Sequence, residues 1–181
     1  MDIVINVEDS IYLNSSWNLS YLNNSTKMFL FRLANNNLGY NYMLTHFVPG
    51  HSPLCTFCEI ARDGEAPRET PGHLFHDCPY INPLITMAIA WLVPDIRDRE
   101  KITRKGLIGK PALDCEYKNE ILFLLFKLCL KYIYDCKLKK YLPNFENCKE
   151  ILIDEVKTML RCSRKFRMKF ENSNIRILQI L

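Results

Sequence analysis

Four residues with metal-binding side chains lie in one short window of the chain. They follow the pattern Cys-x2-Cys-x14-His-x4-Cys, and they are Cys55, Cys58, His73 and Cys78. Two cysteines separated by two residues can turn both sulfur atoms toward one ion, because the loop between them forms a tight knuckle. The histidine and the third cysteine can then complete a tetrahedron. Three thiolates and one imidazole form a closed shell, with no open position for water, so we predict one structural Zn²⁺ at these residues.

Two alternatives stand beside this ligand set. The four residues could be incidental core side chains, or His76 could replace His73. Only one residue separates His76 from Cys78, which is a poor spacing for two ligands of one ion, so the pattern favours His73. Thr70 and Pro71 are typical of a helix start, as N-cap and first helical residue. The polar run 62–65 predicts an exposed turn within the insert.

The sequence around these residues is similar to that of a known family. The segments that carry the similarity are Phe29-Leu-Phe-Arg-Leu-Ala-Asn-Asn-Asn-Leu-Gly-Tyr-Asn, Thr45-His-Phe-Val, Cys55-Thr-Phe-Cys58 and Glu69-Thr-Pro-Gly-His-Leu-Phe-His-Asp-Cys78-Pro. Over roughly 27–165 the chain resembles the zinc-binding region C-terminal to the polymerase in non-LTR (LINE-type) retrotransposon reverse transcriptases. The run 130–137 resembles the helix that follows the knuckle there. The resemblance implies the same four ligands, and we interpret the chain as a detached C-terminal region.

The sequence predicts no catalytic site. It has no Tyr-x-Asp-Asp polymerase motif and no second carboxylate cluster able to hold two catalytic Mg²⁺ ions. Asp114, Glu116 and Glu120 faintly resemble a nuclease set, but acids near a helix start are typical of capping and surface charge. A deaminase would place a His-x-Glu before its Cys-x2-Cys, and none occurs. We therefore expect neither an enzyme nor a small-molecule substrate.

Charge is unevenly distributed along the chain. The formal net charge is +4, but residues 1–100 carry a net of −5 and residues 101–181 a net of +9. The densest basic block contains Lys157, Arg161, Arg164, Lys165, Arg167 and Lys169. Such a block can bind phosphate backbones, although a solvated helix face is an equally good reading. Phe166 and Phe170 lie beside it, where they could stack on bases or belong to the core.

Hydrophobic periodicity predicts a mainly helical fold. We expect helices over 25–36, capped by Ser25 or Thr26 and ended by the following Asn and Gly residues, and over 81–93. We expect a longer antiparallel pair over 116–140 and 144–169. Residues 40–48 fit either a short helix or an extended run, 95–105 fit a loop or surface helix, and 106–112 should be irregular. The predicted fold class is mainly α, a helical domain built around a small Cys-Cys-His-Cys zinc knuckle, with little β structure.

Four segments follow from this pattern. They are an Asn-rich N-terminal segment (1–26), a helix plus zinc-knuckle module (27–80), a buried helix and connector (81–112), and the antiparallel helical pair with its basic C-terminal end (113–170).

The five other cysteines are Cys115, Cys129, Cys136, Cys148 and Cys162. They read as reduced core thiols, which favours a reducing compartment.

No apolar stretch is long enough to span a membrane, and the N-terminus lacks a basic signal-peptide start, so we expect an intracellular protein, cytoplasmic or nuclear. Two functions remain open. The first is a zinc-stabilised module that binds RNA or DNA through its basic helix. The second is a zinc-stabilised interaction domain, whose apolar helix 116–140 packs on a reverse transcriptase core or a second chain.

Overall fold

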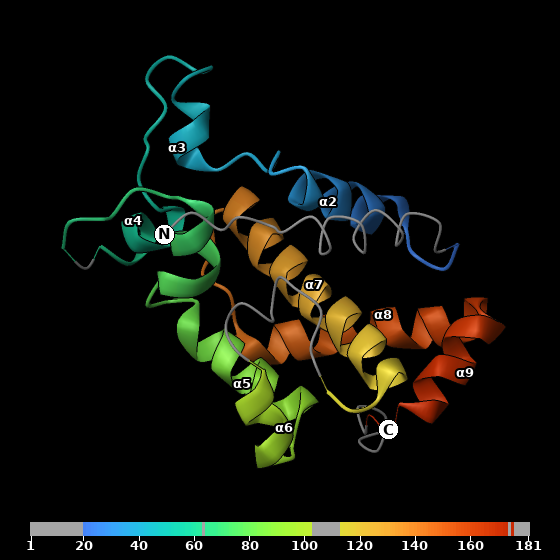
Figure 1. Ribbon diagram of the computed structural model, residues 1–181. Helices are drawn as coiled ribbons and strands as arrows, with labels where there is room; N and C mark the ends of the chain where they lie inside the picture. Colours follow the sequence, from blue (N-terminus) through green and yellow to red (C-terminus); the bar gives the residue numbers. More distant parts are fainter. Residues whose placement is uncertain (1–19, 63, 103–112, 174, 176–181) are drawn as a thin grey trace.

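The helix α7 (Glu116–Leu138) forms the centre of the fold. The computed structural model describes residues 20–62, 64–102, 113–173 and 175. Apolar side chains lie on every face of α7, and Leu122, Leu125 and Ile133 are fully buried. Helices α2, α5, α8 and α9 surround it (Figure 1). The predicted helix 116–140 is therefore confirmed, as a core helix of this chain.

Helix α2 (Asn24–Ala34) packs Phe29, Leu30 and Leu33 against the core. Its cap differs from the prediction, because the side chain of Asn23, rather than Ser25 or Thr26, accepts a hydrogen bond from the Thr26 N–H at 2.8 Å. The helix ends as predicted. Asn36 adopts the left-handed conformation with φ of 49°, which asparagine tolerates better than most residues.

Helices α5 (Asn82–Leu92) and α6 (Ile96–Lys101) follow the knuckle. Helix α5 confirms the predicted helix 81–93, and it ends before Pro94. It buries Leu84, Ala88 and Leu92. Asp95 begins α6 by accepting a hydrogen bond from the Arg97 N–H at 2.8 Å. The predicted irregular run 106–112 lies outside the described residues, as do residues 1–19 of the N-terminal segment.

The predicted helix 144–169 is wrong as a single element. The chain forms α8 (Phe145–Cys162) and α9 (Arg164–Asn172), which meet at Ser163. Ser163 is extended, with φ of −140° and ψ of 111°, and its hydroxyl accepts a hydrogen bond from the Phe166 N–H at 3.1 Å. This new N-cap starts a second helix, which returns to α7 (Figure 1). Helix α8 contacts both α7 and α9.

Three short helices frame the predicted knuckle. They are α3 (Asn41–Leu44), α4 (Thr56–Ala61) and the π-helix η2 (His73–Asp77). Within the described residues, the only β pairing is one antiparallel bridge between Leu54 and Arg68. Phe57, Leu74 and Phe75 join the knuckle to the same apolar core as α7. The mainly α fold with little β structure is confirmed.

The described helices include none long and apolar enough to cross a lipid bilayer.

The five cysteines outside the knuckle are free thiols, but they are not all in the core. Cys129, Cys136 and Cys148 are buried as predicted, whereas Cys115 is half-buried and Cys162 is exposed. Cys162 is the last residue of α8.

Candidate metal centre

The structure brings the four predicted ligand residues together. One side-chain ligand atom from each of Cys55, Cys58, His73 and Cys78 lies within 4.8 Å of the others, in a buried group. The sulfur of Cys78 lies 3.9 Å from each of the other two sulfurs. Nε2 of His73 lies 3.5 Å from the sulfur of Cys58. This group could hold one metal ion.

Three of the six separations between ligand atoms fit the edges of a tetrahedral site. Zinc–sulfur bonds of about 2.3 Å and zinc–nitrogen bonds of about 2.0–2.1 Å imply sulfur–sulfur edges of about 3.8 Å and sulfur–nitrogen edges of about 3.5 Å. The observed edges are 3.9, 3.9 and 3.5 Å. Because all four corners are protein side chains, the site would be closed to water and suited to a structural role.

A short hairpin positions the first two ligands. The backbone N–H of Cys55 donates to the Pro67 carbonyl oxygen at 2.8 Å, next to the Leu54–Arg68 bridge. Cys55 then forms the N-cap of α4, which places Cys58 in the first turn of that helix. Helix α4 ends at Arg62 in the left-handed conformation, with φ of 55°. Arg62, Gly64 and Glu65 are exposed, as the predicted turn requires.

A π-helical turn positions the other two ligands. The Thr70 hydroxyl accepts a hydrogen bond from the His73 N–H at 3.1 Å, so Thr70 caps this segment as predicted. The Cys78 N–H then donates to the carbonyl oxygen of His73, five residues earlier, at 2.8 Å. The wider π turn places residues five apart on one face. His76 is not part of the group, so the arrangement agrees with the choice of His73.

The three thiols have unequal acidity without an ion. A hydrogen bond from Cys78 is the main cause that lowers the pKa of Cys55 to about 4. Burial, followed by the nearby Cys55 thiolate, raises the pKa of Cys58 to about 11. The hydrogen bond that Cys78 gives to Cys55 raises the pKa of Cys78 well above its ordinary value. Of the three thiols, Cys55 therefore ionises most readily.

A buried ion pair beside the cluster was not predicted from the sequence. Glu69 and Lys137 are 0% and 4% exposed, and Nζ of Lys137 lies 2.6 Å from Oε1 of Glu69. Burial lowers the pKa of Lys137, and the Glu69 carboxylate opposes that shift. Lys137 also donates to the Gly39 carbonyl oxygen. The only signal in the sequence is a glutamate directly before the Thr70 cap, and it does not identify its partner.

The Glu69 carboxylate also accepts hydrogen bonds from the backbone around the cluster. Its Oε1 accepts from the Asn41 N–H at 2.9 Å. Its Oε2 accepts from the N–H and the hydroxyl of Thr56, both at 3.1 Å. In the sequence, Thr56 lies between Cys55 and Cys58. One carboxylate therefore joins α3, α4 and the C-terminal end of α7.

The six predicted nucleic-acid-binding residues are divided between α8 and α9. Lys157 is half-buried, and Lys169 forms an ion pair with Glu120. Arg167 also donates to the Leu160 carbonyl oxygen, at 2.8 Å from Nη2, at the end of α8. The four exposed members, which we call the α8–α9 basic surface, are Arg161, Arg164, Lys165 and Arg167.

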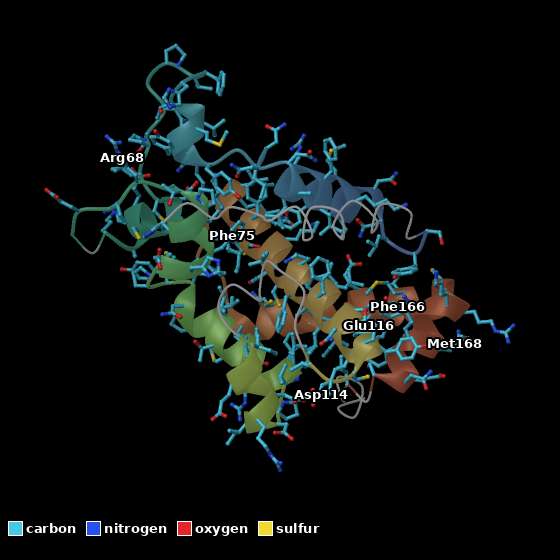
Figure 2. The ribbon with its side chains drawn as sticks, viewed as in Figure 1. Arg68, Phe75, Asp114, Glu116, Phe166 and Met168 are labelled. Atoms are coloured by element: carbon cyan, nitrogen blue, oxygen red, sulfur yellow. The ribbon has the colours of Figure 1, made fainter. Side chains whose placement is uncertain are left out.

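The aromatic residues of this region face inward. Phe166 and Phe170 are 0% and 7% exposed, so they belong to the core and cannot stack on a base. Figure 2 shows Phe166 between α8 and α9, and Met168 at the outer side of α9. The acids Asp114 and Glu116 are exposed at the start of α7, near α9 in the same view. Their exposure agrees with surface charge.

Figure 2 also relates the knuckle to the core. Phe75, which follows two residues after His73, lies inside the molecule next to the end of α7, whereas Arg68 lies at the outer edge.

Comparison of the chain with protein-family models, curated proteins and solved structures finds no match. The helical fold and the buried Cys3His group are therefore the findings from which function is inferred.

Proposed function

We propose that this chain is a zinc-binding, nucleic-acid-binding module without polymerase or nuclease chemistry. The observation that carries the proposal is the buried Cys3His group, in which three of the six ligand-atom separations match the edges of a tetrahedral zinc site. In its ligand pattern and flanking residues the chain resembles the zinc-binding C-terminal region of non-LTR retrotransposon reverse transcriptases. That resemblance extends the proposal from metal binding to an association with RNA or DNA.

The ligand chemistry favours one structural Zn²⁺. Three thiolates and an imidazole are soft and borderline donors that suit zinc, whereas Mg²⁺ and Ca²⁺ require oxygen ligands. The four protein ligands fill the coordination shell of the ion and leave it no open position, as is typical of a structural zinc site. The ion would hold the start of α4 against the η2 turn and so stabilise this part of the fold.

The basic surface supports the nucleic-acid part of the proposal. Its four exposed cations lie along one helix end and the next helix, and no acid occurs between Val156 and Phe170. Since Phe166 and Phe170 are buried, contact would be made with phosphates rather than by base stacking. Binding of this kind is strongly dependent on salt and weakly dependent on sequence.

The alternative interaction domain rests on an apolar face of helix 116–140. In the structure, that face is covered by the chain's own helices, and 16 residues of α7 are buried. The large apolar residues of α7 that remain exposed are Tyr117 and Leu138, near opposite ends of the helix. Helix α7 therefore offers little continuous apolar area to a partner, and the nucleic-acid proposal is preferred.

Binding of the zinc-loaded protein to labelled single-stranded RNA and DNA, measured at several salt concentrations, tests the proposal. We expect affinity to fall steeply as salt rises, with a log–log slope of roughly −0.7 for each phosphate contact. Sedimentation of the same sample measures self-association. Absence of nucleic-acid binding together with concentration-dependent dimers would overturn the proposal in favour of the interaction domain.

A further inference from the structure

The backbone on both sides of Cys55 is held by side chains that are not metal ligands. The Asn41 amide donates to the Leu54 carbonyl oxygen at 2.7 Å, directly before Cys55. The Glu69 carboxylate accepts from the Thr56 N–H at 3.1 Å, directly after it. Asn41 is itself held by Glu69, through its own backbone N–H. The orientation of Cys55 is thus set by groups anchored on Glu69.

We propose that Glu69, with Lys137 as its counter-ion, is the positioning residue of the metal site and connects the knuckle to α7. This inference rests on the proposed zinc binding and adds a residue beyond the four ligands. The carboxylate holds the start of α4 in the ligand-bearing orientation, so less ordering is left for the ion to impose. Lys137, at the end of α7, fixes the carboxylate in turn by the 2.6 Å ion pair.

A carboxylate is required because both of its oxygens act as acceptors. Oε1 faces the Asn41 N–H and the Lys137 ammonium, and Oε2 faces the N–H and hydroxyl of Thr56. A glutamine has the same shape, but one of its two ends is an NH₂ donor. Whichever way the amide turns, a donor meets a donor on one side. Glu69→Gln should therefore distort the knuckle without a change in side-chain size.

The experiment compares zinc affinities of the full chain by competition with a chelator of known affinity, with thermal unfolding of each variant in parallel. We expect Glu69→Gln to weaken zinc binding by about 10–100-fold, the range for groups that orient metal ligands. Glu120→Gln is the matched control. It removes the ion pair between α7 and Lys169, away from the knuckle, and should leave zinc affinity unchanged whatever it does to stability.

A second variant separates positioning from general stability. Glu69→Gln leaves Lys137 buried without its charge partner, which can impair folding. The double variant Glu69→Gln with Lys137→Met removes that unpaired charge and should recover thermal stability while zinc affinity stays low. Parental affinity in the double variant, or an equal loss in Glu120→Gln, would overturn the inference. A parent chain that binds no zinc would instead overturn the proposed function on which the inference rests.

Discussion

The backbone N–H of Cys78 donates to the carbonyl oxygen of His73, five residues earlier, at 2.8 Å. In an α-helix this bond would span four residues, and residues five apart would point about 140° away from each other. The π turn reduces that divergence and lets an imidazole and a thiolate separated by four residues face the same point. This explains how a His-x4-Cys spacing can serve one metal ion.

Cys58→Ser should abolish stoichiometric zinc binding, because an uncharged hydroxyl replaces one of three thiolates. Without the ion, the loop 59–72 loses its link to the first turn of α4, and trypsin should cleave after Arg62 and Arg68 faster than in the parent. Limited proteolysis followed by mass spectrometry measures this. Cys162→Ser, at an exposed thiol outside the cluster, should behave as the parent. Stoichiometric zinc in Cys58→Ser would show that the ligand assignment is wrong.

Zinc binding at pH 7 should release about two protons per ion, because ligation requires three thiolates. The pKa of Cys55, lowered to about 4, already makes it a thiolate, whereas the raised pKa values of Cys58 and Cys78 keep those two protonated. Zinc affinity should therefore fall as pH falls. Calorimetry in buffers of different ionisation enthalpy counts the protons, and a value near three or near zero would contradict the arrangement.

Ser163→Ala should destabilise the fold by about 1 kcal/mol, the typical cost of a lost N-cap. The mutation removes the hydroxyl that accepts from the Phe166 N–H at 3.1 Å and begins α9. For a chain of this size the melting temperature should fall by roughly 2–4 °C. Ser25→Ala is the control, because Asn23 caps α2, and it should change stability by less than about 0.5 kcal/mol. Equal melting temperatures for both variants would be inconsistent with a capping role for Ser163.

Changing Arg161, Arg164 and Lys165 together to Gln should weaken RNA or DNA binding and flatten its salt dependence by about two units of log–log slope. All three side chains are exposed, so zinc content and folding should be unaffected. The control changes three exposed cations on other elements, Arg32, Arg97 and Lys139, to Gln, with the same change in net charge. An equal loss in both triple variants would assign binding to net charge. An unchanged slope in the first would place the function elsewhere.

The grouping of the four metal-binding side chains and the central helix over 116–140 could be predicted because their signals are local. The Cys-x2-Cys spacing, the Thr70 cap and the apolar period of 116–140 each depend on residues within a few turns of one another. Each corresponds to an element of the structure. The helix stop at Asn36 was predictable for the same reason, since few residue types tolerate a positive φ.

The remainder could not be predicted because it depends on contacts between distant residues. Ser163 is a neutral position within a helical pattern, and it becomes a break because Phe166 and Phe170 gain burial against α7 when the chain turns. Glu69 and Lys137 are far apart in the sequence, and each taken alone has the residue type of an ordinary surface charge. Their pairing appears only when α7 lies beside the knuckle.

Zinc content of the purified full chain, measured by elemental analysis against protein concentration, tests the central claim most directly. The buried Cys3His group predicts one zinc ion per chain, retained through gel filtration and lost in Cys58→Ser. Purified protein with reduced thiols that neither contains zinc nor takes up one equivalent when zinc is added would contradict it.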